Sequence, residues 1–459
     1  MTVQLKKSAP ASAIAITVVD RAAFQALAPK LPAPTRHWLA TLGFVGAADS
    51  LALVPGPDGK LGRVFAGVAH AHAPFALSAL PQALPEGVYA LAEDGLAMDA
   101  EAAALSWELG GYQFDLYKPR RRPPAVLALT NSPAAQRGLA LATAMAATRD
   151  LVNTPAEHMG PEELAKAAQL VAKQHGASFK QIVGDALLKQ NFPAIHAVGR
   201  ASHRAPRLIE LNWGSPKAPR LSIVGKGVCF DTGGLNIKGG EGMRQMKKDM
   251  GGAANALGLA SLIMALKLPL RLQVLIPAVE NAISGNAYRP GDIVPTRKGL
   301  HIEVGNTDAE GRVILSDALA YASEHKPELI IDLATLTGAA RVALGAQLPA
   351  LFSKHFDTAR DLVDLGLKLD DPLWHMPLWA PYKASIESTI GDIVNTGKTP
   401  LAGAVTAALF LEYFVPENQD WLHIDLFAWN DVARPGRPIG GEAQTIRTLL
   451  AYLEQRFAA

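Results

Sequence analysis

The chain has 459 residues, of which 49% are hydrophobic and 19% charged, a composition that excludes a disordered chain and predicts a large buried core. Its net charge of +2 gives no general reason to expect a nucleic acid or an anionic membrane as partner. A chain of this length is expected to form two or three domains. Its single cysteine, Cys229, cannot form an intrachain disulfide, which fits a reducing compartment.

The N-terminal segment does not have the pattern of a leader. The apolar run AIAITVV after Lys6 and Lys7 is short and ends at Asp20, so it predicts a first β-strand rather than a signal peptide. The uncharged stretch 250–266, rich in Gly and Ala, falls short of the ~20 apolar residues that a membrane-spanning helix needs. We therefore expect a soluble, cytoplasmic protein without a membrane partner.

The first part of the chain, to about residue 118, alternates short β-like runs with Ala-rich helical stretches, which predicts a small α/β domain. The segment YKPRRRPPAV follows, and its prolines cannot continue a helix or a central strand. We interpret it as an exposed linker, although such a basic cluster could also bind nucleic acid or an acidic partner. A helix over residues 133–151 then connects the two halves. The predicted divisions are an N-terminal α/β domain (1–125), a linker with connecting helix (126–155) and a catalytic domain (156–459).

From about residue 190 the pattern alternates between strand and helix. The expected strands are RLIELNW, RLSIVGKG, LRLQVLIPAVEN, ELIIDLAT and WLHIDLFAW. The expected helices are GGAANALGLASLIMALK, RVILSDALAYASEHK, TAALFLEYFV and EAQTIRTLLAYLEQRF. Near-continuous apolar strands between helices predict a mostly parallel central sheet that is flanked by helices, which makes the fold class α/β with a smaller and a larger domain. Ligands of such sheets bind outside the carboxyl ends of the strands.

The heptapeptide NTDAEGR places Asp308 and Glu310 two residues apart. In an extended segment, residues i and i+2 point to the same side, so the two carboxylates would meet at one spot. Two like charges so close raise each other's pKa unless a cation lies between them. The pair alone is weak support for a metal site, because most acidic pairs on loops are simply solvated.

A second stretch, VGKGVCFDTGGLNIKGGEGMRQMKKDMGG, contains Lys226, Asp231, Lys238 and Asp249 among nine glycines. It has neither the phosphate-binding loop G-x-x-x-x-G-K-[ST] nor the dinucleotide loop G-x-G-x-x-G. Four carboxylates on loops at one sheet edge suit two divalent cations. Carboxylates with a single nitrogen donor fit Zn²⁺, Mn²⁺ or Co²⁺. We expect Cys229 to be a small buried hydrophobic residue rather than a ligand.

These motifs resemble those of the leucyl aminopeptidase family, the cytosol aminopeptidases, which are dimetal peptidases of the M17 type. NTDAEGR matches the family signature in full, and GKGVCFDTGGLNIK and MKKDMGGAA match at fitting spacing. The resemblance extends from about residue 105 to about 432, through TRDLVNTPAEHMGPEELA, PLWAPYKASIESTIGDIVNTG, AGAVTAALFLEYF and WLHIDLFAW. The first hundred residues show nothing specific to the family, and ARPGRPIGGEAQTIRTL matches its usual ending only loosely.

The resemblance implies a site with two divalent metal ions, Mn²⁺ or Zn²⁺. The tighter ion would be held by Lys226, Asp231, Asp249 and Glu310, and the more exchangeable one by Asp231, Glu310 and Asp308. A lysine ligand must be neutral, so the metal must displace the proton of Lys226. We read Lys247, Lys248 and Lys267, in contrast, as surface lysines, and His301, His325 and His423 as structural or exposed.

The resemblance also implies the chemistry of an aminopeptidase, a hydrolase that removes N-terminal residues, preferably Leu or Met, from peptides through a metal-bridged hydroxide. Lys238 would stay charged and stabilise the oxyanion, and Arg312 would bind bicarbonate as the general base. The alternative for Arg312 is a purely structural role as an ion-pair partner of Glu310. Met246 and Thr335 would line the pocket for the first side chain, and Leu336 and Gly338 would offer backbone groups to the peptide.

Family members are hexamers, so the resemblance implies a homohexamer in the cytoplasm that acts on peptides with a free N-terminus. Two alternatives stay open at this point. One is a different dimetal hydrolase, such as a phosphoesterase, which would call for histidine-rich ligation. The other is an additional role in DNA binding, against which the balanced charge argues and which the KPRRR segment leaves open.

Overall fold

The computed structural model describes residues 2–458, which divide into two compact units. The first unit runs to Ala146 and includes residues 432–439. The second unit runs from Ala147 to Asp431 and resumes at Gly440. None of the helices within residues 2–458 has the length and apolar character that a membrane crossing requires.

The first unit is built on a six-stranded sheet with the order β1-β6-β5-β2-β4-β3, parallel except for the β3–β4 hairpin. Its strands are β1 (Val3–Lys6), β2 (Ile14–Val19), β3 (Leu51–Pro55), β4 (Leu61–Gly67), β5 (Val88–Leu91) and β6 (Val126–Thr130). Its helices are α1 (Arg21–Leu27), α2 (Ala33–Thr41), α3 (Leu80–Ala83) and α4 (Ala100–Gly110), followed by α5 (Pro133–Asn153), which continues into the second unit.

The basic segment before β6 folds back onto the first unit. The guanidinium of Arg122 donates to the carbonyl oxygen of Leu84 at 2.5 Å, and Arg120 pairs with Asp115 at 2.5 Å. The indole of Trp107, buried in the core of this unit, donates to the Ala125 carbonyl at 3.0 Å. Residues 126–130 form the strand β6 of the first sheet, although the predicted domain division placed them in the linker with connecting helix.

The second unit is built on a nine-stranded sheet with the order β16-β15-β18-β14-β9-β11-β8-β7, and β10 also pairs with β11. The strands are β7 (Ser178–Val183), β8 (Arg207–Trp213), β9 (Arg220–Gly225), β10 (Gly227–Asp231), β11 (Arg271–Asn281), β14 (Leu329–Ala334), β15 (Ala350–Ser353), β16 (Trp374–Met376) and β18 (Trp421–Asp425). The four central strands β18, β14, β9 and β11 are parallel, and antiparallel neighbours flank them on both sides. The predicted α/β class with a mostly parallel central sheet is confirmed.

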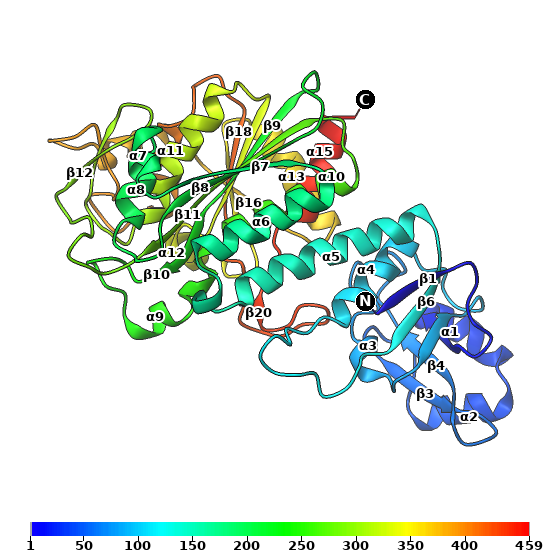
Figure 1. Ribbon diagram of the computed structural model, residues 1–459. Coiled ribbons are helices and arrows are strands. Elements are labelled where there is room, and N and C mark those ends of the chain that lie inside the picture. The colour runs from blue at the N-terminus through cyan, green and yellow to red at the C-terminus, as the bar shows by residue number, and fades with distance from the viewer. Residues whose placement is uncertain (1, 459) are drawn as a thin grey trace. The chain divides into compact units, whose positions relative to one another are not determined.

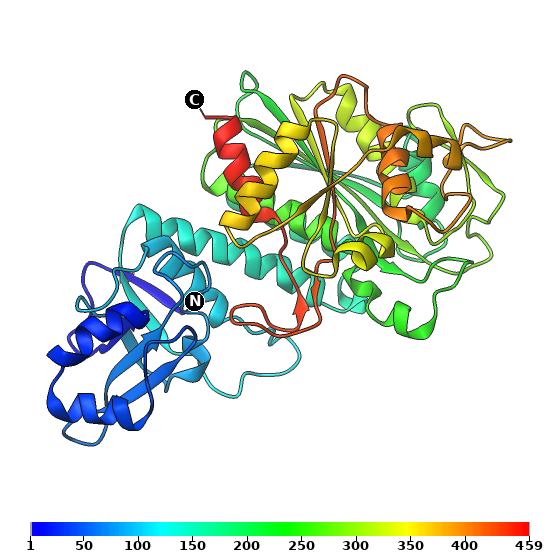
Figure 2. The ribbon, with the colours of Figure 1, turned by 180° about the vertical axis from the view of Figure 1, so that it is seen from behind.

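Helices cover both faces of this sheet (Figures 1 and 2). On one face α10 (Gly251–Ala265) packs on β9 and β14, beside α6 (Pro161–His175) and α15 (Ile446–Arg456). On the other face α11 (Glu310–Glu324) packs on β9, β11 and β14, beside α8 (Pro193–Gly199) and α14 (Gly403–Glu412). A Cβ at Gly252 would lie 2.1 Å from the Leu333 carbonyl oxygen, so the small residues of α10 let it approach β14 closely.

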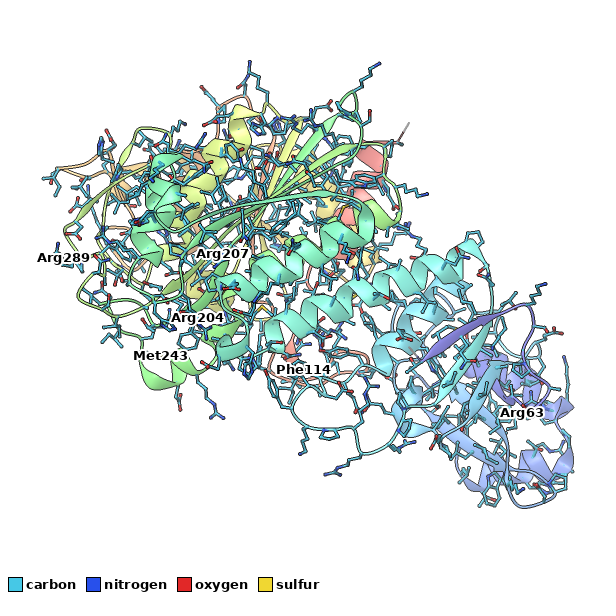
Figure 3. The ribbon with its side chains drawn as sticks, viewed as in Figure 1. Arg63, Phe114, Arg204, Arg207, Met243 and Arg289 are labelled. Atoms are coloured by element: carbon cyan, nitrogen blue, oxygen red, sulfur yellow. The ribbon has the colours of Figure 1, made fainter. Side chains whose placement is uncertain are left out.

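The remaining elements lie around these two layers or in the first unit, and most of them are short. They are α7 (Ala186–Lys189), α9 (Gly240–Arg244), α12 (Gly338–Leu344), α13 (Phe356–Lys368), the small sheet β12 (Ile293–Pro295), β13 (His301–Glu303) and β17 (Ile393–Val394), the pair β19 (Trp429–Asn430) and β20 (Gly440–Gly441), and the 3₁₀ turns η1 (Ala28–Lys30), η2 (Ala156–His158), η3 (Met246–Met250) and η4 (Ala380–Ile386). The turn after α5 is fixed by Arg204, whose guanidinium pairs with Glu157 at 3.4 Å and with Glu280 at 3.3 Å (Figure 3).

One strand is shorter than its sequence predicts. The apolar run WLHIDLFAW predicts a strand to Trp429, but β18 ends at Asp425. Ala428 has a φ of 54°, a left-handed conformation that turns the chain away from the sheet. Because of this turn, Leu426 and Phe427 line a cavity at the sheet edge instead of continuing the strand.

Candidate active site

Charged residues gather where the central strands end, which is the edge at which ligands of parallel sheets bind. Lys226 follows β9 directly, and Asp231 is the last residue of β10. Asp249 lies in η3, immediately before α10. All three side chains are buried, although they come from segments between strands and helices.

The NTDAEGR segment reaches the same place, but not in the extended form that its spacing suggested. Asp308 lies in a turn, and Glu310 is the first residue of α11. The two carboxylates converge because the chain turns between them into the helix. One carboxylate oxygen each of Asp231, Asp308 and Glu310 lies within 4.8 Å of the other two.

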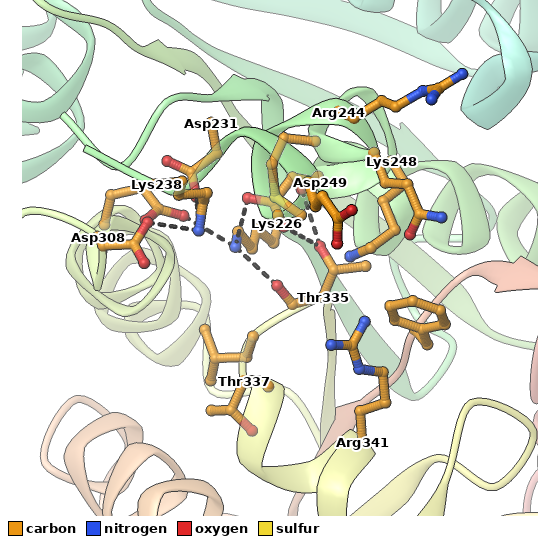
Figure 4. Close-up of a pocket in the computed structure, with 18 of the residues that line it drawn as sticks. Lys226, Asp231, Lys238, Arg244, Lys248, Asp249, Asp308, Thr335, Thr337 and Arg341 are labelled. Carbon is orange, nitrogen blue, oxygen red and sulfur yellow. Dashed lines mark hydrogen bonds and ion pairs between the residues drawn. The ribbon is translucent and has the colours of Figure 1, made fainter. Parts of the chain in front are cut away.

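Two lysines lie between the carboxylates (Figure 4). The Nζ of Lys226 lies 2.8 Å from Asp249 Oδ2 and 2.9 Å from Glu310 Oε1, and it donates to the carbonyl oxygen of Thr335 at 2.8 Å. The Nζ of Lys238 lies 2.9 Å from Asp231 Oδ2 and 2.5 Å from Asp308 Oδ1. The site therefore pairs each lysine with two carboxylates.

Burial and the surrounding charges shift the ionisation of this cluster. Burial alone would lower the pKa of Lys226, but the charges of Asp249, Glu310 and Asp231 outweigh it and raise that pKa above its ordinary value. Burial, assisted by the neighbouring Asp231, raises the pKa of Glu310 to about 8 and that of Asp308 to about 6. The carboxylates carry more negative charge than the two lysines compensate.

The donor set fits additional cations. Four carboxylates face two lysines, and Glu310 Oε2 is buried without a hydrogen-bond partner among residues 2–458. An unpaired buried acceptor costs free energy that a cation would recover. Gly311 serves the same centre: a Cβ there would lie 2.6 Å from Lys226 Cε, so the glycine makes room for the lysine.

Several residues that sequence reasoning missed hold this site in position. Asn281, at the end of β11, donates from Nδ2 to Asp231 Oδ1 at 2.8 Å and to the Thr307 carbonyl at 2.9 Å. Tyr288 also donates to that carbonyl, at 2.6 Å. Asn395 accepts the N–H of Gly305 at 2.8 Å and donates to the Asn306 carbonyl at 2.8 Å. The only signal in the sequence was a polar amide that ends a long apolar strand.

A cavity of about 790 Å³ opens over the cluster, and its lining includes Met246, Thr335, Leu336 and Gly338. Thr335 donates from Oγ1 to Asp249 Oδ1 at 2.8 Å, so it positions that carboxylate as well as lining the cavity. The N–H of Leu336 donates to Asp425 Oδ1 at 3.0 Å, which leaves the carbonyl oxygen as the backbone group that Leu336 can offer. Gly338 begins α12.

Arg312 lies beside the cluster rather than within it. It is 8% exposed and donates from Nη1 to the Asn395 carbonyl at 2.8 Å, and its Nε is buried without a hydrogen-bond partner among residues 2–458. Burial lowers the pKa of Arg312 to about 10, against the charge of Glu310, which raises it. In the described structure Arg312 makes no ion pair with Glu310, so the alternative of a purely structural pairing gains no support. Its side chain instead lines a second cavity that also borders Asp308.

The lysine assignments from the sequence need one correction. Lys267 is exposed, whereas Lys247 is half-buried and donates to the Asn153 carbonyl at 2.5 Å. Lys248 is only 6% exposed and lines the large cavity, so reading it as a surface residue was wrong. Its burial depends on Phe427, whose ring centroid lies 4.6 Å from its Nζ and whose position after β18 could not be read from the local sequence.

The histidines and the cysteine lie outside the site. His301 is exposed and lies 3.3 Å from Asp392, and the ring of His325 packs on Tyr321. His423 is fully buried, with Nδ1 2.6 Å from Asp332 Oδ1. Cys229 is buried in β10. No histidine is among the described residues that line the large cavity.

Buried carboxylates that lack sufficient counter-charge, set at the carboxyl edge of a parallel sheet beneath a cavity, define a metal-dependent hydrolase. The comparison with family models specifies the class. Residues 146–450 match the catalytic domain of the cytosol aminopeptidase family, and residues 14–130 match the N-terminal domain of the M17 aminopeptidases. The chain belongs to the cytosol aminopeptidase family, which confirms the predicted family and the predicted aminopeptidase-type hydrolase.

Individual relatives agree with the family. A probable cytosol aminopeptidase of Syntrophotalea carbinolica is 42% identical over 365 residues, which cover 76% of this chain and 73% of the relative. One of Stenotrophomonas maltophilia is 43% identical over 66% of this chain and 63% of its own length. The crystal structure of the cytosol aminopeptidase from Coxiella burnetii is 47% identical and covers 99% of both chains with a TM-score of 0.94. A bottromycin maturation enzyme in complex with Mn is 31% identical, covers 97% of this chain and 100% of its own, and has a TM-score of 0.87.

Proposed function

We propose that this chain removes N-terminal residues from peptides with the help of two divalent cations, Mn²⁺ or Zn²⁺, held by the carboxylate cluster. The observation that carries the proposal is the buried Glu310, which has one oxygen on Lys226 at 2.9 Å and the other without a partner among the described residues. The solved relative with Mn supports manganese as one of the two candidates.

The proposed ligand sets follow the resemblance. One cation would be held by Lys226, Asp231, Asp249 and Glu310, and the other by Asp231, Glu310 and Asp308. Lys226 would act as a neutral ligand, which requires that its proton, now shared with Asp249 and Glu310, is released when the cation binds. When bound, two such cations activate water and polarise a peptide carbonyl.

Lys238 would keep its charge and stabilise the oxyanion of the attacked carbonyl. Its side chain is 18% exposed, against 3% for that of Lys226, so it is the lysine that a substrate can reach. The surrounding carboxylates raise the pKa of Lys238 despite its burial, which keeps it a cation at neutral pH. A preorganised cation next to a developing oxyanion is worth several kcal/mol of transition-state stabilisation, about 3–4 in measured cases.

Arg312 would bind bicarbonate, which moves a proton from water to the leaving amine. The support is its position in the second cavity, where it borders Asp308 and keeps a buried Nε free of protein acceptors among the described residues. A guanidinium suits the role because it binds a planar anion through two N–H groups and stays charged.

The substrate would be a peptide with a free α-amine. Acylation removes the basic lone pair of that amine, and with it the ability of the amine to bind a cation in the site. Met246 and Thr335 would line the pocket for the first side chain, while the Leu336 carbonyl and the Gly338 N–H would hold the peptide backbone. We also propose that the chain works in the cytoplasm as a homohexamer, a state that sedimentation equilibrium would test.

The two alternatives gain no support from the structure. A phosphoesterase site would be expected to use histidine ligands, and no described residue of that type lines the large cavity. DNA binding would need a free basic face, yet Arg120 and Arg122 of the KPRRR segment are engaged with Asp115 and the Leu84 carbonyl.

The test is hydrolysis of leucine p-nitroanilide beside its N-acetyl counterpart, after chelation and again after addition of Mn²⁺ or Zn²⁺. We expect cleavage of the free-amine substrate alone, and only with metal. Cleavage of the acetylated substrate, or activity that survives chelation, would contradict the proposal.

A further inference from the structure

One wall of the large cavity carries two cations that the proposed mechanism does not use. The Nζ of Lys248 lies 4.6 Å from the ring centroid of Phe427, and the guanidinium carbon of Arg341 lies 4.9 Å from the same centroid. Figure 4 shows the Lys248 and Arg341 side chains extending toward one another across this end of the cavity. All three residues line it.

Neither cation has an anionic partner in the part of the chain that the structure describes. Of the nearby carboxylates, Asp249 is engaged by Lys226 and Thr335, at 2.8 Å each. Asp425 accepts the N–H groups of Leu336 and Thr337, and its Oδ2 accepts the hydroxyl of Thr337 at 2.6 Å. Lys248 and Arg341 therefore line the cavity without forming an ion pair with these carboxylates.

An uncompensated cation at this position costs free energy. Lys248 is 6% exposed, and a buried charge without a counter-ion is strongly disfavoured compared with an apolar residue of similar size. A second cation beside the same ring, that of Arg341, adds repulsion. An anion in the cavity would relieve both costs, and charge-assisted hydrogen bonds to a carboxylate are about twice as strong as neutral ones.

The position of this pair points to the first side chain of the substrate. Along the chain, Lys248 directly precedes the proposed metal ligand Asp249 and follows Met246 by two residues. Met246 would line the pocket for that side chain. Arg341 lies one turn along α12 from Gly338, which borders the same cavity. A residue whose α-amine is bound at the metal site would extend its side chain along this wall.

We propose that the pocket for the first residue binds an anionic side chain, so that the preferred substrates are peptides that begin with glutamate or aspartate. This inference rests on the proposed aminopeptidase function and replaces the Leu or Met preference that the resemblance implied. The apolar surface of Phe427 and Met246 still accommodates the methylene groups of such a side chain.

The test uses aminoacyl 7-amido-4-methylcoumarins of Glu, Gln and Leu on the Mn²⁺-loaded protein. These substrates carry no C-terminal carboxylate, so a preference for Glu over Gln must arise from the first side chain. We expect kcat/KM for Glu to exceed that for Gln by about tenfold or more, which corresponds to about 1.4 kcal/mol. Lys248→Met should bring the ratio to about 1, and Arg341→Gln should lower it less, because Arg341 is exposed and its charge is screened.

The control variant is Lys247→Met, which removes the neighbouring cation from a side chain that does not line the cavity. It should keep the wild-type ratio, whereas Lys248→Met should lose a larger factor in kcat/KM on the Glu substrate than on the Leu substrate. A binding experiment provides a readout without turnover: free L-glutamate should bind the wild-type protein about tenfold more tightly than L-glutamine by titration calorimetry, and equally in Lys248→Met.

Three results would overturn the inference. Equal kcat/KM for Glu and Gln in the wild-type protein would show that the wall does not select an anion. An equal loss on all three substrates in Lys248→Met would show that Lys248 acts only through Asp249. A preference for Leu-Ala over Leu-Ala amide that Lys248→Met abolishes would assign the cations to the C-terminal carboxylate of dipeptides. Absence of activity on all three substrates with every metal would instead refute the proposed function, and the calorimetric comparison would still decide whether the wall binds a side-chain carboxylate.

Discussion

The second unit contains two kinds of buried carboxylate, and they differ in what satisfies them. Asp371 accepts the N–H groups of Thr445 at 2.9 Å, Arg447 at 2.9 Å and Thr448 at 3.1 Å, at the start of α15. Asp317 in α11 likewise accepts three backbone N–H groups, those of Ala194, Ile195 and Arg297. Both carboxylates join segments that are distant in sequence, and both are held by groups that cannot leave.

Two carboxylates of the candidate site, Asp231 and Asp249, are only half held in this way. Asp231 Oδ1 accepts the N–H of Gly233 and the amide of Asn281, but its Oδ2 faces Lys238. Asp249 Oδ1 accepts the Thr335 hydroxyl, but its Oδ2 faces Lys226. One oxygen is anchored and the other is offered to a cation. A buried carboxylate that is completed by amides is therefore structural, and one that is completed by exchangeable cations marks the functional site.

The largest effect is expected where the offered oxygens lie. Glu310→Gln keeps the shape of the side chain but removes the charge that would join both cations. We expect kcat/KM on leucine p-nitroanilide to fall by about 10³-fold or more, because the electrostatic stabilisation of the transition state is lost. The matched control is Glu324→Gln at the exposed end of the same helix, which should retain activity. If kcat/KM of the Glu310→Gln variant stays within tenfold of the wild-type value, the distinction between the two kinds of buried carboxylate is contradicted.

Substitution of Lys238 should lower the activity somewhat less than substitution of Glu310. In Lys238→Met the cation that would face the substrate carbonyl is absent, while the ligands proposed for both metals remain. We expect kcat to fall by about 10²–10³-fold with metal affinity nearly unchanged. Lys166→Met, which removes an exposed lysine on α6, serves as the control. Loss of metal binding in Lys238→Met with normal kcat at saturating metal would assign the residue to the metal site instead.

Arg312→Gln tests the residue beside the cluster. We expect a loss of about 10²-fold in kcat, the lower range of general acid–base catalysis. Activity of the wild-type protein should rise with added bicarbonate in carbonate-depleted buffer, and the activity of the variant should not. The exposed Arg360 of α13 offers a control substitution. An equal response of both proteins to bicarbonate would remove Arg312 from the role of anion holder.

Asn281→Ala sharpens the distinction between anchored and offered oxygens. The variant loses the donor that fixes Asp231 Oδ1 at 2.8 Å. We expect metal affinity to weaken by about 10–100-fold, with most of the activity restored at saturating metal. The exposed Asn286 provides a control of the same residue type. Unchanged metal affinity would show that the anchor does not orient the ligand.

Asp317→Asn should leave the site almost untouched and instead change the pH dependence of stability. Burial raises the pKa of Asp317 to about 7, although the backbone hydrogen bonds from Arg297, Ile195 and Ala194 lower it. The folded-state pKa of Asp317 lies above its unfolded value of about 3.9. The contribution of Asp317 to the free energy of unfolding is therefore fully present below about pH 4 and is lost as the pH rises through 7.

The measurement is the free energy of unfolding of both proteins in urea between pH 5 and pH 8. The wild type should lose about 2–3 kcal/mol relative to Asp317→Asn over this range, since each pKa unit is worth about 1.4 kcal/mol. Activity per folded molecule should be equal in both. Parallel pH curves would show that Asp317 stays ionised throughout, and a large loss of activity per folded molecule would break the distinction between the two kinds of carboxylate.

Local pattern was sufficient for the central strands. The apolar runs over 207–213 and 270–281 predicted β8 and β11 to within a residue, because a strand covered on both faces is apolar along its whole length. It was also sufficient to bring Lys226, Asp231, Asp249, Asp308 and Glu310 to one sheet edge, since each lies in a loop or at the end of an element there.

What the sequence could not provide depends on contacts between distant segments. The turn at Ala428 places Phe427 over Lys248, and only that contact shows that the lysine is buried. Asn281 and Asn395 have no motif of their own, and their roles appear only when β11 and the loop after β17 meet the NTDAEGR turn. The convergence of Asp308 and Glu310 through a helix start, rather than through an extended segment, also required the structure.

The most direct test of the account is the number of cations that the cluster holds. The protein would be stripped with chelator, dialysed against Mn²⁺ and analysed for bound metal per chain, together with Glu310→Gln and with the Glu324→Gln control. We predict two Mn²⁺ ions per chain in the wild type and the control, and loss of at least one in Glu310→Gln. A folded wild-type protein that binds no Mn²⁺ and no Zn²⁺ would contradict the claim that the offered oxygens of Asp231, Asp249, Asp308 and Glu310 form a metal site.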